Sequence, residues 1–204
     1  MDFEKINYPS ETYVTQFDRL FFSWDAQFMS PWLKMDTSGA FLEDGTPASL
    51  AITCKQTLSG APTLNCGNQF KSVLGNQPFP QGYRSYFEVK INKGSNFKIG
   101  IAGRKCEINL AFSDGKEGWA YYSGGFLRHN SGGDGPKYGV AYSDNSIVGV
   151  YVDLIEGKLF FSKDGRMMPI AYENKHFLTM ELYPAVSCFQ PGESFQLIMP
   201  MPED

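Results

Sequence analysis

The chain has 204 residues, of which 42% are apolar and 15% aromatic, so it can bury a sizeable core as one large domain. Its formal net charge is −4 and its basic residues do not cluster, which argues against nucleic acid as a partner. No apolar run approaches the roughly 18 residues of a membrane span, so we expect no membrane insertion.

The N-terminus and the cysteines favour a reducing compartment. The first ten residues, MDFEKINYPS, lack the basic flank and apolar run of a signal peptide. The cysteines Cys54, Cys66, Cys106 and Cys188 form no C-x-x-C pair, and the chain has 2 histidines. We therefore expect free thiols and no metal. A cytoplasmic location is expected, with the nucleus as the alternative.

A stripe of large apolar residues near the N-terminus recurs at helical spacing. It consists of Phe17, Leu20, Phe21, Trp24 and Phe28. Pro31 should end such a helix near Ser30. We expect residues 1–34 to form a short helical or extended arm that packs this stripe on a domain of residues 35–202. The alternative is that the stripe docks another protein or another part of a larger polypeptide.

Farther along the chain, apolar residues alternate with a period of two, which is typical of β-strands. Strands are predicted at residues 85–91, 97–102, 118–122, 148–154, 158–162, 182–187 and 194–199. Turn signals separate them, for example Asp164-Gly165, and the spacing indicates an all-β sandwich or barrel. Within the clearest hairpin, Val148, Val150 and Val152 share one face.

No catalytic group of residues is recognisable. His129 and His176 lie in polar loops without a nucleophile motif. The glycine-rich residues 131–139 lack the Gly-Lys-Ser/Thr of a phosphate-binding loop. The acidic turns along the chain are isolated and match no calcium site. These observations favour a recognition module over an enzyme.

Several motifs in sequence together resemble the SPRY family. They are GYRSYFEVKI (82–91), FKIGIAGR (97–104), EGWAYYSGGFLRHN (117–130), VGVYVDLIEGKLFFSKDG (148–165) and ELYPAVSCFQPGESFQL (181–197). The hairpin and the LYPAVS strand are the most specific parts, and the resemblance covers roughly residues 35–199. It implies a bent, concanavalin-like β-sandwich of two antiparallel sheets, without catalysis or cofactor.

The resemblance also implies a function. SPRY domains typically bind a protein or short peptide through loops at one end of the sandwich, often as adaptors in ubiquitin-ligase or signalling assemblies. A monomeric domain is expected, alone or within a larger polypeptide or complex. The alternative is a carbohydrate-binding β-sandwich, which an exposed planar aromatic platform with nearby acids or calcium would favour.

The family pattern places the partner-binding residues in three loops. They are Lys55, Gln56 and Thr57 in the first, Ile108, Asn109 and Phe112 in the second, and Phe189, Gln190 and Pro191 in the third. The two phenylalanines would serve as anchors, and the amides would pair with a peptide backbone. Alternatively, both rings turn inward and cap the core. Trp119 and Tyr121 share a strand face and are expected in the core.

Overall fold

The computed structural model describes residues 7–36, 51–55 and 69–199, which form fourteen strands, one α-helix and one 3-10 helix. The helices are α1 (Glu11–Val14) and η1 (Lys175–Leu178). The strands are β1 (Asp18–Arg19), β2 (Trp24–Met29), β3 (Leu33–Asp36), β4 (Ala51–Cys54), β5 (Lys71–Gly75), β6 (Arg84–Lys93), β7 (Phe97–Ala102), β8 (Gly118–Tyr122), β9 (Phe126–Arg128), β10 (Ile147–Asp153), β11 (Lys158–Lys163), β12 (Arg166–Glu173), β13 (Tyr183–Cys188) and β14 (Ser194–Leu197).

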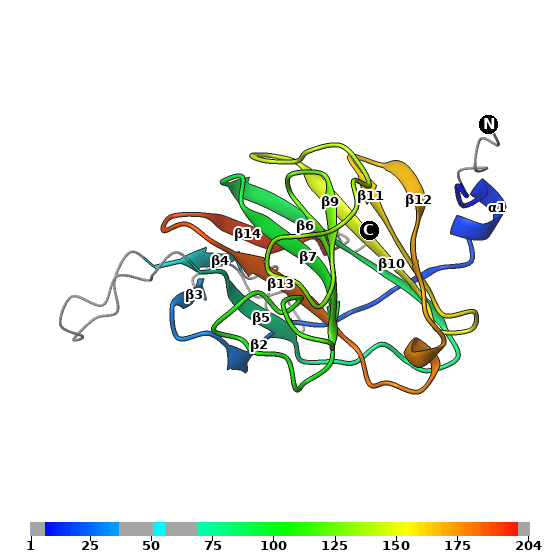
Figure 1. The fold of residues 1–204 in the computed structure, drawn as a ribbon, viewed down its shortest axis with the longest axis horizontal. Coiled ribbons are helices and arrows are strands. Elements are labelled where there is room, and N and C mark those ends of the chain that lie inside the picture. The colour runs from blue at the N-terminus through cyan, green and yellow to red at the C-terminus, as the bar shows by residue number, and fades with distance from the viewer. Residues whose placement is uncertain (1–6, 37–50, 56–68, 200–204) are drawn as a thin grey trace, which may run out of the picture.

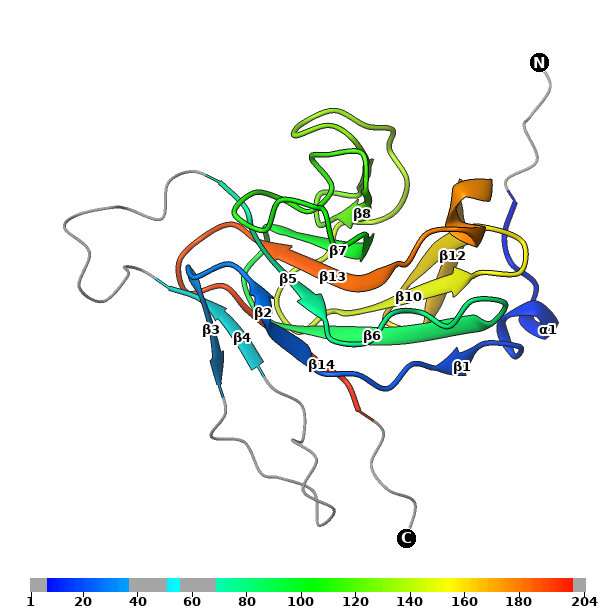
Figure 2. The same ribbon diagram turned by 90° about the horizontal axis from the view of Figure 1, so that it is seen from below.

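The strands build two sheets that pack face to face. Sheet A has eight strands in the order β12-β11-β10-β6-β14-β4-β3, with β1 beside β6, and sheet B has six in the order β2-β5-β13-β7-β8-β9. All pairings are antiparallel except the short parallel one between β1 and β6. Figure 1 shows the bent sandwich, and Figure 2 shows β13 and β7 in one layer with β6 and β10 in the other. The predicted two-sheet antiparallel sandwich is confirmed.

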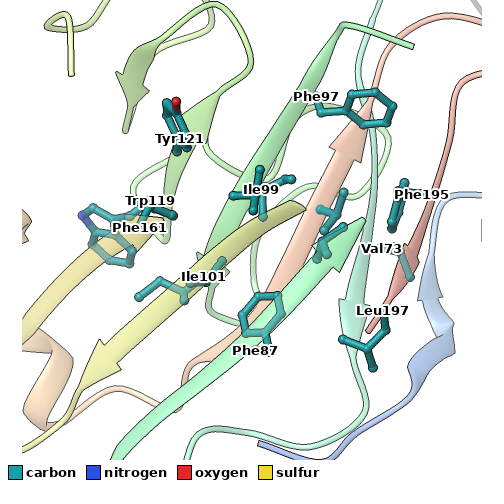
Figure 3. Packing of buried hydrophobic residues seen from close by; sticks show 14 of the residues in the cluster. Val73, Phe87, Phe97, Ile99, Ile101, Trp119, Tyr121, Phe161, Phe195 and Leu197 are labelled. Carbon is teal, nitrogen blue, oxygen red and sulfur yellow. The ribbon is translucent and has the colours of Figure 1, made fainter. Parts of the chain in front are cut away.

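Side-chain alternation fills the space between the sheets. In β6, every second residue from Ser85 to Ile91 is buried, as period-2 geometry requires. Figure 3 shows Phe87 from β6 in the same packed layer as Ile99 from β7. Trp119 and Tyr121 also point into this layer, so the prediction that they belong to the core is confirmed.

The predicted hairpin of β10 and β11 is present, and both of its faces are covered. Val150 and its inward neighbours lie in the core, but the outward-facing Tyr151 and Asp153 are buried as well. The turn that follows has positive φ at Asp164 (49°) and Gly165 (77°). Positive φ at both central residues matches the twist of a two-residue hairpin loop, as the Asp-Gly pair predicts.

The N-terminal segment covers the outward face of this hairpin. Phe17 packs edge-on against Tyr151 and Phe160, with ring centroids 5.6 and 5.3 Å apart. The hydroxyl of Tyr13 donates to Asp153 at 2.5 Å, and this carboxylate is fully buried. The segment therefore seals the outer face of sheet A with apolar contacts and a hydrogen bond.

The N-terminal segment takes the extended one of its two expected forms, so only the helical reading of the stripe is wrong. The only helical turn in this segment, α1, begins after Ser10, whose side chain accepts from Tyr13 N. Residues 17–28 contain β1 and the start of β2, joined by irregular backbone. In that form β1 pairs with the part of β6 that β14 leaves open, and β2 pairs with β5. These ladders satisfy backbone groups at two sheet edges, which a helix could not do. Phe17 and Trp24 are buried, Leu20 and Phe28 are half-buried, and Phe21 is 60% exposed.

Residues 7–36 contribute to both sheets, and β3 crosses the expected boundary between residues 34 and 35. The division into an arm of residues 1–34 and a domain of residues 35–202 stays a prediction. In the described ranges, no helix is long and apolar enough to cross a membrane, and no group of three or more His, Cys, Asp or Glu could hold a metal ion. Cys54, Cys106 and Cys188 carry reduced thiols.

Candidate functional site

The loop between β7 and β8 lies flat on the outer face of sheet B, held by two outward-facing serines. Ser72 N donates to the carbonyl of Ile108 at 2.9 Å, and Ser72 Oγ donates to that of Leu110 at 2.5 Å. Ser187 Oγ accepts from Phe112 N at 3.3 Å. Because both serine side chains are short, the loop backbone approaches the sheet closely.

This arrangement buries Phe112, so the expectation that its ring is an exposed anchor is wrong. The ring is fully buried in a cluster on the outer face of sheet B that includes Leu74 and Tyr183. A Cβ at Gly118 would lie 2.0 Å from the carbonyl oxygen of Phe112, so glycine is needed for this close approach. The Phe112 ring therefore points toward the protein and not toward solvent, which was the alternative expectation. It packs on the outer face of sheet B and not between the two sheets.

Residues 30–32 join the first loop to the second. Ser30 Oγ donates to Asn109 Oδ1 at 2.9 Å, and Lys55 Nζ donates to the carbonyl of Pro31 at 2.9 Å. Lys55 N also donates to the carbonyl of Trp32 at 2.9 Å. Lys55 and Asn109, which were predicted from separate loops, are thus connected through one short segment.

A buried carboxylate fixes the third loop. Glu193 is 5% exposed, and its Oε2 accepts from Phe189 N at 2.9 Å and Gln190 N at 2.8 Å. Its Oε1 accepts from Ser95 N at 3.0 Å and Asn96 N at 2.8 Å in the β6–β7 turn. One side chain therefore binds two loops together, and hydrogen bonds to a charged acceptor are stronger than neutral ones.

The ring of Phe189 rests on side chains that the sequence did not point to. Phe70 lies 5.0 Å from it between ring centroids, and Phe70 also packs edge-on against Tyr122. Lys98 Nζ lies 4.5 Å from the centre of the Phe70 ring and pairs with Asp114 at 2.8 Å. Burial lowers the pKa of Lys98, and the ion pair with Asp114 opposes that shift. The half-buried ring of Phe189 therefore rests on the Phe70 ring, which in turn contacts the ion-paired Lys98.

Alternating rings and cations continue across the outer face of sheet B. The guanidinium of Arg128 lies 5.0 Å from the ring centre of Tyr122 and 5.3 Å from that of Phe126. We call this set the aromatic–cation row: Phe189, Phe70, Lys98, Tyr122, Arg128 and Phe126. Lys71, next to Phe70, donates from Nζ to the carbonyl of Asn109 at 3.2 Å, which joins the row to the second loop.

The nine predicted partner-binding residues therefore differ in accessibility. Asn109, Gln190 and Pro191 are exposed, Lys55, Ile108 and Phe189 are half-buried, Phe112 is buried, and Gln56 and Thr57 lie outside the described residues. We call the six accessible residues together with the aromatic–cation row the loop surface. Its outward-pointing strand positions, such as Tyr122 next to core Tyr121, could have been found from strand alternation.

Loops held by hydrogen bonds at a two-sheet sandwich, with exposed amides and partly exposed rings, are typical of a binding module. The sequence model of the SPRY domain family matches residues 84–202, and the chain belongs to this family. As a SPRY domain, it is a protein-interaction module.

Known relatives are similar to more than half of the chain. Ran-binding protein 9 of Xenopus tropicalis is 32% identical over 126 residues, which is 60% of this chain and 22% of that protein. The human protein of the same name is also 32% identical, over 17% of its length. The dual specificity protein kinase splA of Dictyostelium discoideum is 30% identical over 120 residues, 5% of its length. The chain thus spans less than a quarter of each of these relatives.

Solved structures share the fold. The SPRY domain of human HERC1 superimposes with a TM-score of 0.63 at 15% identity, covering 88% of this chain and 99% of that domain. A second structure, described as a human SPRY domain, gives a TM-score of 0.57 at 17% identity over 72% of this chain and 89% of that one.

Proposed function

We propose that the loop surface recognises a protein or a short peptide, and that the chain is the partner-recognition part of a ubiquitin-ligase or signalling assembly. The observation that supports this proposal best is that the predicted loops are linked to one another by direct contacts. Direct contacts run from Lys55 through residues 30–32 to Asn109, and from there through Lys71 and Phe70 to Phe189. Loops that are distant in sequence thus offer one partner a single uninterrupted face.

Each part of the surface has a chemical role in this proposal. Phe189 is the anchor, since a ring with two χ angles gives a large contact area at little conformational entropy cost. The amides of Asn109 and Gln190 pair with the partner's backbone. The hydrogen bonds of Glu193 hold the third loop before binding, which lowers the ordering cost of association.

The test is capture of partners with a matched pair of variants. The loop variant carries Gln190→Ala and Pro191→Ala. The control carries Gln77→Ala and Pro80→Ala, the same residue types, also exposed, in the β5–β6 connection. Quantitative mass spectrometry should find proteins that the wild type and the control capture and that the loop variant loses.

The outcomes separate the alternatives. Equal capture by the loop variant and the control would refute the loop surface as the recognition site. Capture that disappears when glycans are removed from the lysate would instead support the carbohydrate-binding function. The adaptor role makes a further demand. An adaptor contacts the rest of its assembly through a face other than the loop surface, so the loop variant should still capture ubiquitin-ligase or signalling subunits.

A further inference from the structure

A second concave surface lies at the far edge of sheet A. It is a cleft of about 600 Å³ between the loop of residues 138–140, the β11–β12 turn with the start of β12, and Tyr8. Strands β11, β10, β6 and β14 separate β12 from β4, after which Lys55 follows. Figure 1 shows β12 and β4 on opposite sides of the molecule. The cleft lies far from Lys55 and shares no lining residue with the loop surface, although Tyr138 N donates to the carbonyl of Gly125, next to Phe126 at the end of the aromatic–cation row.

The walls of the cleft are fixed by specific contacts. Tyr138 Oη donates to the carbonyl of Pro169 at 2.6 Å and accepts from Phe161 N at 3.3 Å, which ties the loop to β11 and β12. A Cβ at Gly139 would lie 2.3 Å from the sulfur of Met168, so glycine allows the loop to sit directly on β12. Hydrogen bonds and close packing thus hold the concave shape of the cleft.

Several large apolar side chains line the cleft. Val140 is 62% exposed and Tyr8 is 58% exposed. They are two of the five large hydrophobic residues in the described ranges whose exposure is 50% or more. Met167 and Met168 line the same cleft. Methionines adapt to differently shaped apolar partners, and clustered exposed apolar side chains mark interaction sites.

Positive charge borders this apolar lining. Lys163, Asp164 and Arg166 all line the cleft, but Asp164 is already engaged, since it accepts from Ile147 N at 2.8 Å and pairs with Lys163. Arg166 is exposed and makes no ion pair with any residue in the described part of the chain. Arg166 also interacts electrostatically with Asp164, whose pKa it helps to lower, but its guanidinium forms no direct ion pair there. On a chain of net charge −4, this exposed guanidinium beside the cleft favours an anionic partner group.

We infer that this cleft binds an acidic peptide segment of a partner protein, with a large apolar side chain against Val140 and the methionines and a neighbouring carboxylate on Arg166. The peptide does not add a strand to β12. Pro169 has no N–H to offer, and Ile170 N already donates to the carbonyl of Asn7 at 2.9 Å. Recognition therefore uses side chains, one apolar anchor and one charge.

The experiment is selection of a phage-displayed random dodecapeptide library on the whole chain. Selected peptides are then measured against Arg166→Glu and Val140→Asp in the cleft and against Lys34→Glu, a matched charge reversal at an exposed site on β3. Thermal melting by circular dichroism establishes that the variants fold. The change at Arg166 converts attraction for a carboxylate into repulsion.

We expect a group of peptides with Asp or Glu within two positions of Leu, Met, Phe or Trp. Their affinity should fall about tenfold or more with either cleft variant, which corresponds to about 1.4 kcal/mol, and should stay within about twofold with Lys34→Glu. Replacing the acid by Lys should abolish binding. If no selected peptide responds to both cleft variants, the inference is overturned. Peptides lost only with Gln190→Ala and Pro191→Ala would also overturn it, while supporting the loop surface.

Discussion

Replacing Glu193 by glutamine should detach the third loop from the β6–β7 turn. The carboxylate offers one oxygen to Phe189 N and Gln190 N and the other to Ser95 N and Asn96 N. An amide has a single acceptor oxygen. Whichever way it turns, its NH₂ group faces two backbone donors, and those two N–H groups lose their acceptor.

The magnitude follows from this count. A buried donor left without a partner costs about 1–3 kcal/mol, so two cost about 2–6 kcal/mol. Because the loops can relax and admit water, we expect the free energy of unfolding to fall by about 2–3 kcal/mol. Glu173→Gln, at an exposed position at the end of β12, is the matched control and should change it by less than about 0.5 kcal/mol.

Urea unfolding followed by tryptophan fluorescence measures this difference, and two-dimensional NMR of the backbone amides locates it. The amide resonances of Phe189, Gln190, Ser95 and Asn96 should shift together in Glu193→Gln, because one side chain holds all four. A variant as stable as wild type, with these four resonances unmoved, would refute the idea that this carboxylate organises the loops.

Further substitutions separate surface from core. Phe189→Ala should cost less than about 1.5 kcal/mol of stability by urea unfolding but about 1–3 kcal/mol of partner affinity, and a loss confined to stability would contradict its role as anchor. Phe17→Ala should cost about 3–5 kcal/mol of stability, whereas the exposed Phe21→Ala should stay within about 0.5 kcal/mol. Tyr13→Phe removes the hydrogen bond to Asp153. Burial raises the pKa of Asp153, but this hydrogen bond and those from Arg84 and two backbone N–H groups lower it below 3.8. Burial together with Asp153 raises the pKa of Tyr13 above 10.0. The bond therefore stabilises fully above the unfolded carboxyl pKa and below the unfolded phenol pKa, so the stability curves of wild type and variant should differ by about 1–3 kcal/mol from about pH 5 to 9. The two curves should approach each other gradually below about pH 4, as pH falls through the lowered pKa of Asp153, and above about pH 10, as pH rises through the raised pKa of Tyr13.

The central strands could be predicted from the sequence because their signal is local. Residues 97–102 and 118–122 were expected as strands and form β7 and β8 with the same limits. The turn at Asp164 and Gly165 was also predicted, since few residue pairs accept positive φ at both positions. Alternation and turn chemistry depend on neighbours along the chain, so sequence reasoning can evaluate them.

The N-terminal stripe shows where local periodicity misleads. The spacing of Phe17 and Trp24 fits one helical face, yet these residues serve different surfaces. Phe17 packs on the outer face of sheet A, and Trp24 packs between the sheets. Two short strands reach both surfaces because β6 and β5 offer open pairing positions. Those positions are set by distant parts of the chain, which periodicity cannot reveal.

The loop surface was predicted only in part for the same reason. The direction of Phe112 depends on Ser72 and Ser187, which anchor its loop to sheet B from strands far away in sequence. Phe70 was missed because it precedes a strand without any motif of its own, although it contacts Phe189 directly. Tyr122 was assigned no role, since an outward strand position reads as ordinary solvent-facing surface.

The structure also explains why the N-terminal segment carries so many rings. The outer face of sheet A presents Tyr86, Tyr151 and Phe160 in adjacent strands, with ring centroids 5.3 and 4.9 Å apart. Exposing such rings would forfeit about 1.5–3 kcal/mol for each one, so Phe17 and Tyr13 cover them. The family match begins at residue 84, which is after this cover. The cover lies on sheet A and the aromatic–cation row on sheet B, so the segment around Phe17 stabilises the sandwich without covering the proposed recognition surface.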